Sequence, residues 1–175
     1  ERDHPDRILG LHRTAAHWFA HHHMLGEAVD HALAAGDEQL AVDLVSEEGL
    51  SLAERSHLTS LLALIDKLPP RAVAKSPRLQ LNLGWGNVPL QRLSRAKLAL
   101  DTARKALIHS DLPERELSAL RIEADVLEAA TEMQADRPGR IDGLIGECLA
   151  DPDALSPWVA SAAADFATYC VLFRF

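Results

Sequence analysis

The sequence is poor in the residues that build sheets and basic surfaces. Aromatic residues make up 5% of the 175 positions, and the β-branched residues Val, Ile and Thr are sparse beside the many Leu and Ala. This composition favours helices over sheets. The formal net charge of −8 argues against non-specific binding to nucleic acid or anionic lipid, because that binding needs a basic surface.

Cysteine is scarce as well. Cys148 and Cys170 lie in apolar helical patterns, with no CxxC motif and no histidine at metal-ligand spacing beside them. We therefore expect buried thiols in a reducing cytoplasm, with a redox role as the less favoured alternative. No segment reaches the apolar length of a membrane span, and there is no signal peptide. Since the first residue is not Met and the chain stops inside an apolar pattern, we expect a piece of a larger protein.

Motifs of catalysis are also missing. The sequence has no HExxH, no phosphate-binding GxxxxGK[ST], no nucleophile elbow and no carboxylate pair in an evident cleft. Glu147, Asp151 and Asp153 form an acidic group that a helix end and a solvated loop explain better than a metal site. We therefore predict that this chain is not an enzyme and holds no metal or cofactor of its own.

Helical spacing accounts for the first seventy residues. A first helix should start near Pro5, with Asp3 as a cap. Its apolar stripe, which we expect to be buried, consists of Ile8, Leu11, Ala15, Trp18, Phe19 and His22. Gly26 separates it from a second helix, which Gly36 closes.

Asp37 should cap a third helix, in which Gly49 marks a kink or break. Ser56 is the expected cap of a fourth helix, with Leu58, Leu61, Leu62 and Ile65 facing inwards. Pro69 and Pro70 then stop that helix, because proline removes a backbone donor and clashes with the preceding turn.

The stretch SPRLQLNLGWGNVP, residues 76–89, is ambiguous. Its leucines and Trp85 alternate with polar or small residues, which is the period of a strand, yet Ser76 followed by Pro77 is a helix start. A lone strand among helices would have no partner, so we predict a helix. Gly84 and Gly86 then imply that a neighbouring helix approaches closely, because glycine in a helix interior costs about 1 kcal/mol against alanine.

Later helices follow at residues 93–107, 113–135, 141–149 and from Pro157 onwards. Helix starts near 77, 115 and 157 alternate with return helices near 91 and 139. The result is a two-helix unit of about forty residues, the length range of helical solenoids, in which each unit buries its apolar face against its neighbours. We predict an all-α superhelical array of antiparallel helix pairs, a tetratricopeptide-like α-α solenoid.

Five histidines lie within residues 17–31. His17 and His21 are four residues apart on the outer face of the first helix. They could chelate a divalent ion together, but only as an exposed two-ligand site with open positions. We favour a solvated helix face.

The segment PDRILGLHRTAAHWFAHHHMLGEAVDHALAAGD resembles part of the MalT-like, LuxR-type large ATP-binding transcriptional regulators, which belong to the STAND class of signalling ATPases. These regulators carry a pattern LHRRAAxWFxxxGxxxEAIxHALAAGD. The matching residues here are Leu11, His12, Arg13, Ala15, Ala16, Trp18, Phe19, Glu27, Ala28, His31, Ala32, Leu33, Ala34, Ala35, Gly36 and Asp37. The likeness covers most of residues 5–108. One departure is Gln91, which stands where the family usually has Gly before Arg-Leu, just after Pro89.

The resemblance implies a domain plan. Residues 1–75 would be a helical linker arm that follows the winged-helix part of an ATPase module, and residues 76–175 would be tetratricopeptide-like repeats, truncated at the C-terminus. ATP would bind in the missing ATPase module, and DNA would be contacted elsewhere, since this chain has no basic recognition helix.

The resemblance also implies sensing in the cytoplasm. The repeats would receive a small-molecule inducer or a regulatory protein and relay binding to neighbouring domains. Our candidate ligand-binding residues are Arg78, Asn82, Trp85 and Arg121, although ordinary surface and packing roles explain them too. The alternative function is a protein-interaction scaffold without a small ligand. The last helix should show an apolar side that a missing repeat would cover. We therefore expect the isolated chain to pair with a copy of itself through Phe166, Tyr169 and Phe173, as an effect of truncation and not as a native dimer.

Overall fold

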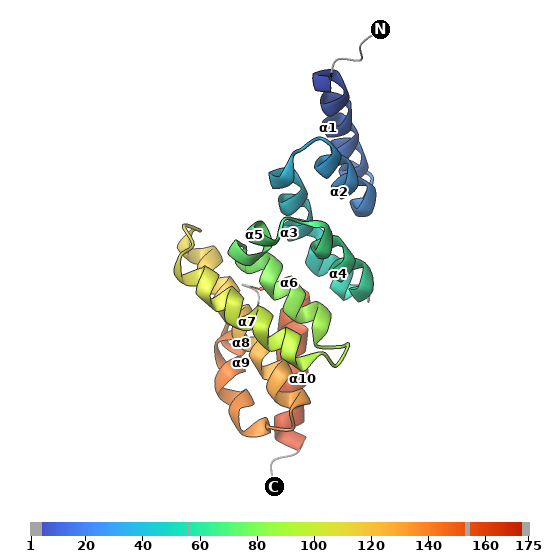
Figure 1. Ribbon diagram of the computed structural model, residues 1–175. Helices are drawn as coiled ribbons and strands as arrows, with labels where there is room; N and C mark the ends of the chain where they lie inside the picture. The colour runs from blue at the N-terminus through green and yellow to red at the C-terminus, as the bar shows by residue number, and fades with distance from the viewer. Residues whose placement is uncertain (1–4, 56, 153–154, 173–175) are drawn as a thin grey trace. The chain divides into compact units, whose positions relative to one another are not determined.

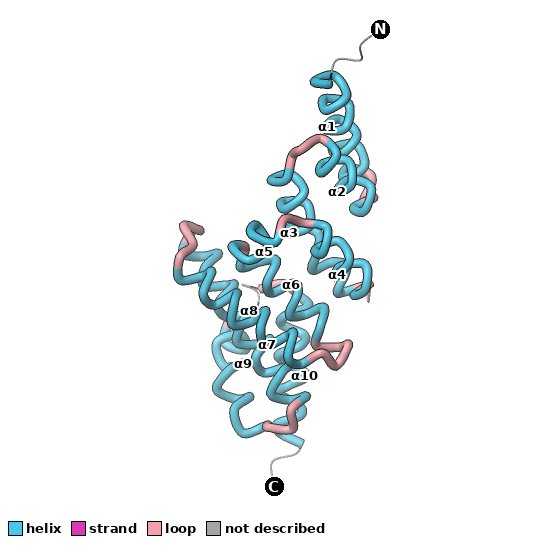
Figure 2. Tube along the Cα trace, in the orientation of Figure 1, coloured by secondary structure: helices cyan, strands magenta, loops and turns pink. Residues whose placement is uncertain are grey.

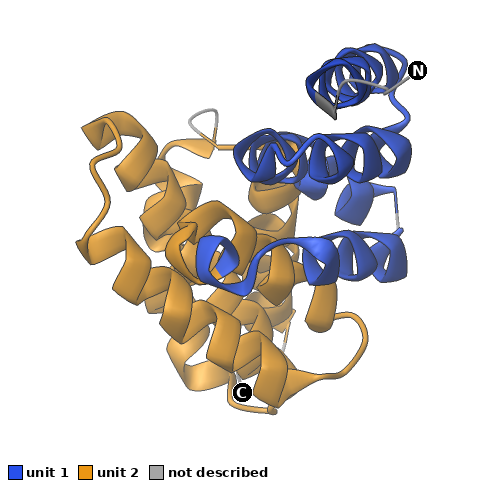
Figure 3. Cartoon of the chain, turned by 45° about the horizontal axis from the view of Figure 1, so that its top comes forward, with its two compact units in different colours: residues 1–73 blue, residues 74–175 orange. Residues whose placement is uncertain are grey.

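The computed structural model describes residues 5–55, 57–152 and 155–172 (Figures 1 and 2). All regular structure in these residues is helical, which confirms the all-α fold class. The chain forms two compact units, residues 1–73 and 74–175, shown in blue and orange in Figure 3. Asp3, Ser56 and Phe173, to which the sequence assigned caps and a contact, lie outside the described residues.

The first unit is a series of helices joined by short turns. It contains α1 (Pro5–His21), α2 (Leu25–Ala34), α3 (Glu38–Glu54) and α4 (Leu58–Lys67), and the short α5 (Pro70–Lys75) crosses the division between the units. Each helix packs against the next, from α1 on α2 to α3 on α4. The core of this unit consists mainly of Ala16, Ala28, Val29, Ala32, Ala41, Val45, Leu61 and Ile65.

The turn between α2 and α3 has the predicted capping residues, Gly36 at the end of α2 and Asp37 at the start of α3. Gly36 has φ +69°, the left-handed conformation that closes a helix at no side-chain cost. Asp37 then accepts a hydrogen bond from the backbone N–H of Leu40 at 3.1 Å. That bond, together with the Arg13 guanidinium 2.9 Å away, holds the pKa of the Asp37 carboxyl below its usual value.

The predicted burial of the α1 stripe is wrong for most of its members. Ile8, Leu11 and Trp18 are 44%, 64% and 53% exposed. Helix α1 instead packs on α2 through an adjacent face, where Ala16 is fully buried and the Phe19 ring stacks on His31 at 5.2 Å. The spacing of apolar residues identified the helix, but which face is covered depends on its neighbours, and α2 covers only this one.

Of the kink or break predicted at Gly49, the break is wrong. Helix α3 runs without interruption from Glu38 to Glu54, and Gly49 is buried within it. A glycine inside a helix lowers its stability without ending it, so packing of the surrounding turns is enough to carry the helix through.

The second unit alternates outgoing and returning helices. It contains α6 (Pro77–Asn87), α7 (Leu93–Ile108), α8 (Glu114–Gln134), a 3-10 turn η1 (Pro138–Arg140), α9 (Ile141–Ala150) and α10 (Pro157–Leu172). Sequential neighbours pack together, and α8 additionally packs on both α6 and α10. This pattern, in which the first helices of successive pairs touch one another, is that of a helical solenoid.

The two Ser-Pro helix starts are confirmed. Ser76 accepts from the backbone N–H of Leu79 at 3.2 Å, and Ser156 accepts from that of Val159 at 3.3 Å. The ambiguous stretch is therefore helix α6. Its close approach to α8 is confirmed at Gly84, since a Cβ added there would overlap the side chain of Leu127.

Gln91 lies in the left-handed region, with φ 57°, in the turn between α6 and α7. Glycine adopts this conformation freely, whereas other residues pay a steric cost there. The turn takes this conformation with Gln, at the position where the resemblance led us to expect glycine.

Cys148 and Cys170 are both buried and free, as predicted. Burial raises the pKa of the Cys148 thiol, which keeps it in the unreactive protonated form at neutral pH. Among the described helices, none is both long and apolar enough to cross a membrane.

Candidate functional site

The structure places two of the predicted ligand residues around one carboxylate. Arg78 on α6 binds Glu123 on α8, with Nη1 and Oε2 2.6 Å apart. Trp85, two turns further along α6, donates its indole N–H to the other oxygen of Glu123 at 3.1 Å. Glu123 is only 3% exposed, so this arrangement joins α6 to α8 inside the second unit.

Burial limits what the predicted residues can reach. Asn82 is fully buried and Trp85 is 3% exposed, with its ring packed edge-on against Trp158 at 6.1 Å between centroids. Arg121 is exposed and pairs with Glu114 of its own helix at 3.2 Å. The structure thus brings Arg78 and Trp85 together through Glu123, whereas Arg121 pairs within α8. Their ligand role stays a prediction.

Sequence reasoning missed Glu123. Its signal was a charge within an otherwise apolar helix face, three residues after Leu120 and four before Leu127, both of which are buried. A carboxylate at such a position needs donors, because burying an unpaired charge is costly. Arg78 and Trp85 are those donors.

Further carboxylates on α8 bind the helices beside it. Arg104 of α7 binds both Asp125 and Glu128, each at 2.6 Å. Burial raises the pKa of Asp125 despite the bond to Arg104. The pKa of Glu132 is lowered. Burial alone would raise it, but Arg137 at 2.5 Å and the other nearby cations outweigh that effect. These pairs tie α8 to α7 and to the turn before α9, a structural role.

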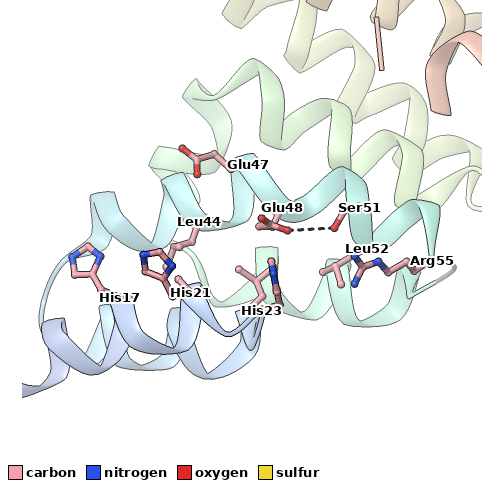
Figure 4. A pocket seen from close by; sticks show the side chains of 11 residues that line it. His17, His21, His23, Leu44, Glu47, Glu48, Ser51, Leu52 and Arg55 are labelled. Atoms are coloured by element: carbon pink, nitrogen blue, oxygen red, sulfur yellow. Dashed lines mark hydrogen bonds between the residues drawn. The ribbon is translucent and has the colours of Figure 1, made fainter. Parts of the chain in front are cut away.

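An open groove lies in the first unit, between α1 and α3 (Figure 4). We call it the α1–α3 groove. Its volume is about 310 Å³, within the range of small-molecule sites. The residues that line it are His17, Ala20, His21, His23, Leu25, Leu44, Glu47, Glu48, Ser51, Leu52 and Arg55.

One face of α3 forms a wall of the groove. Leu44, Glu48, Leu52 and Arg55 follow at steps of four, four and three, which places them along one side of the helix. Figure 4 shows the opposite wall, where the imidazoles of His17 and His21 stand between the α1 ribbon and α3. The predicted outward orientation of these two histidines is confirmed by their exposure.

The charges of the groove lack counter-ions within the described part of the chain. Glu48 accepts a long hydrogen bond from Ser51 at 3.4 Å, and no ion pair involves Glu47, Glu48 or Arg55 there. Other charges of the same unit are paired, as Arg13 with Asp37 and Lys67 with Asp30 show. The groove therefore offers two carboxylates and a guanidinium to a ligand.

The arrangement is not that of a metal site. Over the described residues, no group of three or more His, Cys, Asp or Glu side chains is placed to hold a metal ion. The aliphatic side chains Leu25, Leu44 and Leu52 between the polar groups suit an organic ligand better.

A second pocket of about 560 Å³ lies next to the groove, and the two share His23, Leu25 and Leu52. His23 has φ 56°, at the turn between α1 and α2. The left-handed turn thus places one imidazole where both pockets meet.

Comparisons with known proteins find relatives that include a protein kinase and transcriptional regulators. The chain is 46% identical over all its 175 residues to the serine/threonine-protein kinase PknK of Mycobacterium tuberculosis, of which it covers 16%. It is 32% identical over 147 residues, 81% of its length, to the HTH-type transcriptional regulator MalT of Serratia proteamaculans, again covering 16%. MalT of Yersinia pestis is 32% identical over 143 residues, 79% of this chain and 15% of that regulator.

The chain thus spans about a sixth of the length of these relatives. No protein-family profile matches it. No solved structure matches it either.

Proposed function

We propose that this chain is a regulatory helical-repeat module of a longer signalling protein, which senses an effector and relays its binding to domains elsewhere. One observation carries the proposal. The same stretch of sequence is similar to part of a protein kinase and to part of transcriptional regulators. Because those two classes have different outputs, the shared segment is better suited to receiving a signal than to producing the output.

The chain's own residues agree with an input role. Its sequence holds neither a phosphate-binding GxxxxGK[ST] motif nor the HRD and DFG tripeptides of protein kinases. In the MalT-like plan, which is of the LuxR type and the STAND class, ATP would bind in another module and DNA at a separate helix-turn-helix. In the kinase plan, phosphoryl transfer would take place in a catalytic domain. The module itself would be non-catalytic and cytoplasmic, and it would carry no cofactor.

Relay requires that a ligand bind one arrangement of the domains better than another. The α1–α3 groove is the part of the chain we assign to this ligand, because Glu47, Glu48 and Arg55 line it beside aliphatic side chains and have no ion-pair partner among the described residues. The partner domains of the longer protein would contact the exposed faces of the helices. In the isolated chain, Phe166 and Tyr169 of α10 would also pair with a second copy, apart from the regulatory function, since the neighbouring Val171 is 73% exposed.

The second candidate function is a protein-interaction scaffold without a small ligand. The observation in its favour is the exposed apolar ridge of α1, with Leu11 at 64% and Trp18 at 53% exposure, since such surfaces mark protein contacts. A small ligand in the groove would leave this ridge untouched, so the two functions are separable by experiment.

The test is a thermal-shift screen of the chain against a metabolite library. A ligand at a hundred times its Kd stabilises the folded state by roughly 2.7 kcal/mol. Ser51→Trp fills the groove, whereas Ser118→Trp puts the same side chain on an exposed turn of α8. We expect a compound that stabilises the wild type and Ser118→Trp but not Ser51→Trp. A folded chain that no compound stabilises would overturn the small-ligand function in favour of the scaffold.

A further inference from the structure

Two opposite charges of the α1–α3 groove lie on one line along α3. Glu48 and Arg55 are seven residues apart, and at 3.6 residues per turn seven residues come back to within about 20° of the same direction. Both side chains line the groove and lack an ion-pair partner among the described residues. Along this line the groove has a negative end and a positive end.

The helix fixes the spacing of the Cα atoms of these two residues. A rise of 1.5 Å per residue separates the Cα atoms of Glu48 and Arg55 by about 10 Å. Between them Ser51 offers a hydroxyl and Leu52 an aliphatic side chain. We take this Cα spacing as the span of a matching ligand, which then carries a cation and an anion about 10 Å apart, with a neutral middle.

The remaining lining residues restrict the chemistry of that middle. His17, His21 and His23 offer ring nitrogens that donate or accept hydrogen bonds, and Leu25 and Leu44 offer apolar surface. A plain alkyl zwitterion would leave the imidazoles and the Ser51 hydroxyl without partners. A polyanion such as a nucleotide would meet the carboxylates of Glu47 and Glu48. Amide groups alternating with small side chains satisfy both the polar and the apolar parts.

An extended peptide has these properties. It advances about 3.3–3.6 Å per residue, so three residues cover about 10 Å between the terminal ammonium and the terminal carboxylate. We propose that the α1–α3 groove binds a free peptide of about three residues, with its ammonium at Glu48 and its carboxylate at Arg55. This inference rests on the proposed function, because it names the class of effector for the same groove.

The direct test is calorimetric titration of the chain with trialanine and two capped forms. N-acetyl-trialanine lacks the ammonium and trialanine amide lacks the carboxylate. Because a hydrogen bond to a charged group contributes upwards of about 1.5 kcal/mol, we expect each cap to weaken binding about tenfold. Dialanine and pentaalanine, whose ends lie too close together and too far apart, should bind more weakly than trialanine.

Two variants assign the ends of the peptide. In Glu48→Gln, acetylation should no longer weaken binding, while amidation still does. In Arg55→Gln the pattern should be reversed. Both side chains are exposed, Glu48 on α3 and Arg55 at its C-cap, so the variants should fold, which circular dichroism checks. Glu38→Gln and Arg71→Gln, exposed charges outside the groove, should leave both effects unchanged.

The outcomes separate this inference from the proposed function. Equal binding of capped and uncapped trialanine, or no binding at millimolar concentration, overturns the peptide assignment. If a library compound still stabilises the chain and Ser51→Trp blocks it, the regulatory module stands with a different effector. If neither trialanine nor any library compound binds, both fall.

Discussion

The indole N–H of Trp85 donates to the carboxylate of Glu123 across the α6–α8 contact, at 3.1 Å, and both residues are only 3% exposed. The second oxygen of Glu123 is held by Arg78 at 2.6 Å. The sequence made Arg78 and Trp85 candidate ligand residues, with ordinary packing as the alternative, and the structure gives each a partner inside the protein. The exposed and unpaired charges are found in the first unit instead.

Replacement of Glu123 tests how much this contact stabilises the chain. Glu123→Ala leaves the Trp85 N–H buried without an acceptor. We therefore expect the free energy of unfolding, measured by urea denaturation, to fall by about 1–3 kcal/mol. Glu123→Gln keeps an acceptor and should cost less than Glu123→Ala. Glu114→Ala, which removes the exposed partner of Arg121 on the same helix, should change stability by no more than about 0.5 kcal/mol. Equal costs for Glu123→Ala and Glu114→Ala would contradict the buried role.

Gly84 is the closest approach of α6 to α8, and an added methyl group there would overlap Leu127. Gly84→Ala gains about 1 kcal/mol in helix propensity but overpacks a buried contact, at a cost of about 1–3 kcal/mol. We expect a net loss of up to about 2 kcal/mol by urea denaturation. Gly146→Ala on α9 meets open space and should instead stabilise the chain by about 0.5–1 kcal/mol.

A double variant separates overpacking from other causes. In a Leu127→Ala background the space beside residue 84 is free, so Gly84→Ala should no longer destabilise. A cost that persists in that background would mean that Gly84 is needed for a reason other than the Leu127 contact.

The exposed ridge of α1 gives a third prediction. Leu11 is 64% exposed, so Leu11→Gln, which keeps a good helix former, should alter stability by no more than about 0.5 kcal/mol. Leu61 on α4 is fully buried, so the same change there should cost more than about 3 kcal/mol. Chemical denaturation of both variants decides whether the apolar stripe of α1 is solvated. A large loss of unfolding free energy from Leu11→Gln would mean that Leu11 is buried after all.

The helices could be predicted from the sequence because their caps and apolar spacing depend on residues that are close together in the chain. Helix starts at Ser76, Asp37 and Ser156 depend on side-chain oxygens and backbone N–H groups three residues away, so a short stretch of sequence is enough to find them. Helix interiors were readable too, because apolar spacing is local. The break expected at Gly49 failed because packing with other helices carried α3 through it.

The candidate site was harder to predict from the sequence, because it depends on which helices pack against one another. The α1–α3 groove combines His17 and His21 with Glu48 and Arg55, residues about thirty positions apart that α2 brings together. Burial of Trp85 likewise depends on α8 and α10, and an aromatic residue beside charges looks the same in sequence whether it is covered or open. The charge of Glu123 within an apolar face was the signal of that contact, and sequence reasoning missed it.

The cap of α3 provides a pH-dependent prediction. The backbone N–H of Leu40, followed by Arg13, lowers the pKa of Asp37 in the folded chain below its ordinary value of 3.8. The unfolded chain therefore takes up this proton at a higher pH than the folded chain does. The stabilisation due to the Asp37 charge is complete above about pH 4 and is lost as the pH falls through the lowered folded pKa.

Asp37→Asn isolates the charge, because asparagine caps a helix about as well as aspartate. We expect the difference in unfolding free energy between the wild type and Asp37→Asn to be constant from pH 5 to pH 8, since Asp37 is ionised in both states there. The difference should shrink as the pH falls below 3.8, because protonated aspartate loses the charge that asparagine never had. Arg13→Gln removes the second cause of the lowered pKa, so it should shift the loss to higher pH. Urea titrations at each pH measure this, and an unchanged difference down to pH 2.5 would show that the charge of Asp37 contributes nothing to the cap.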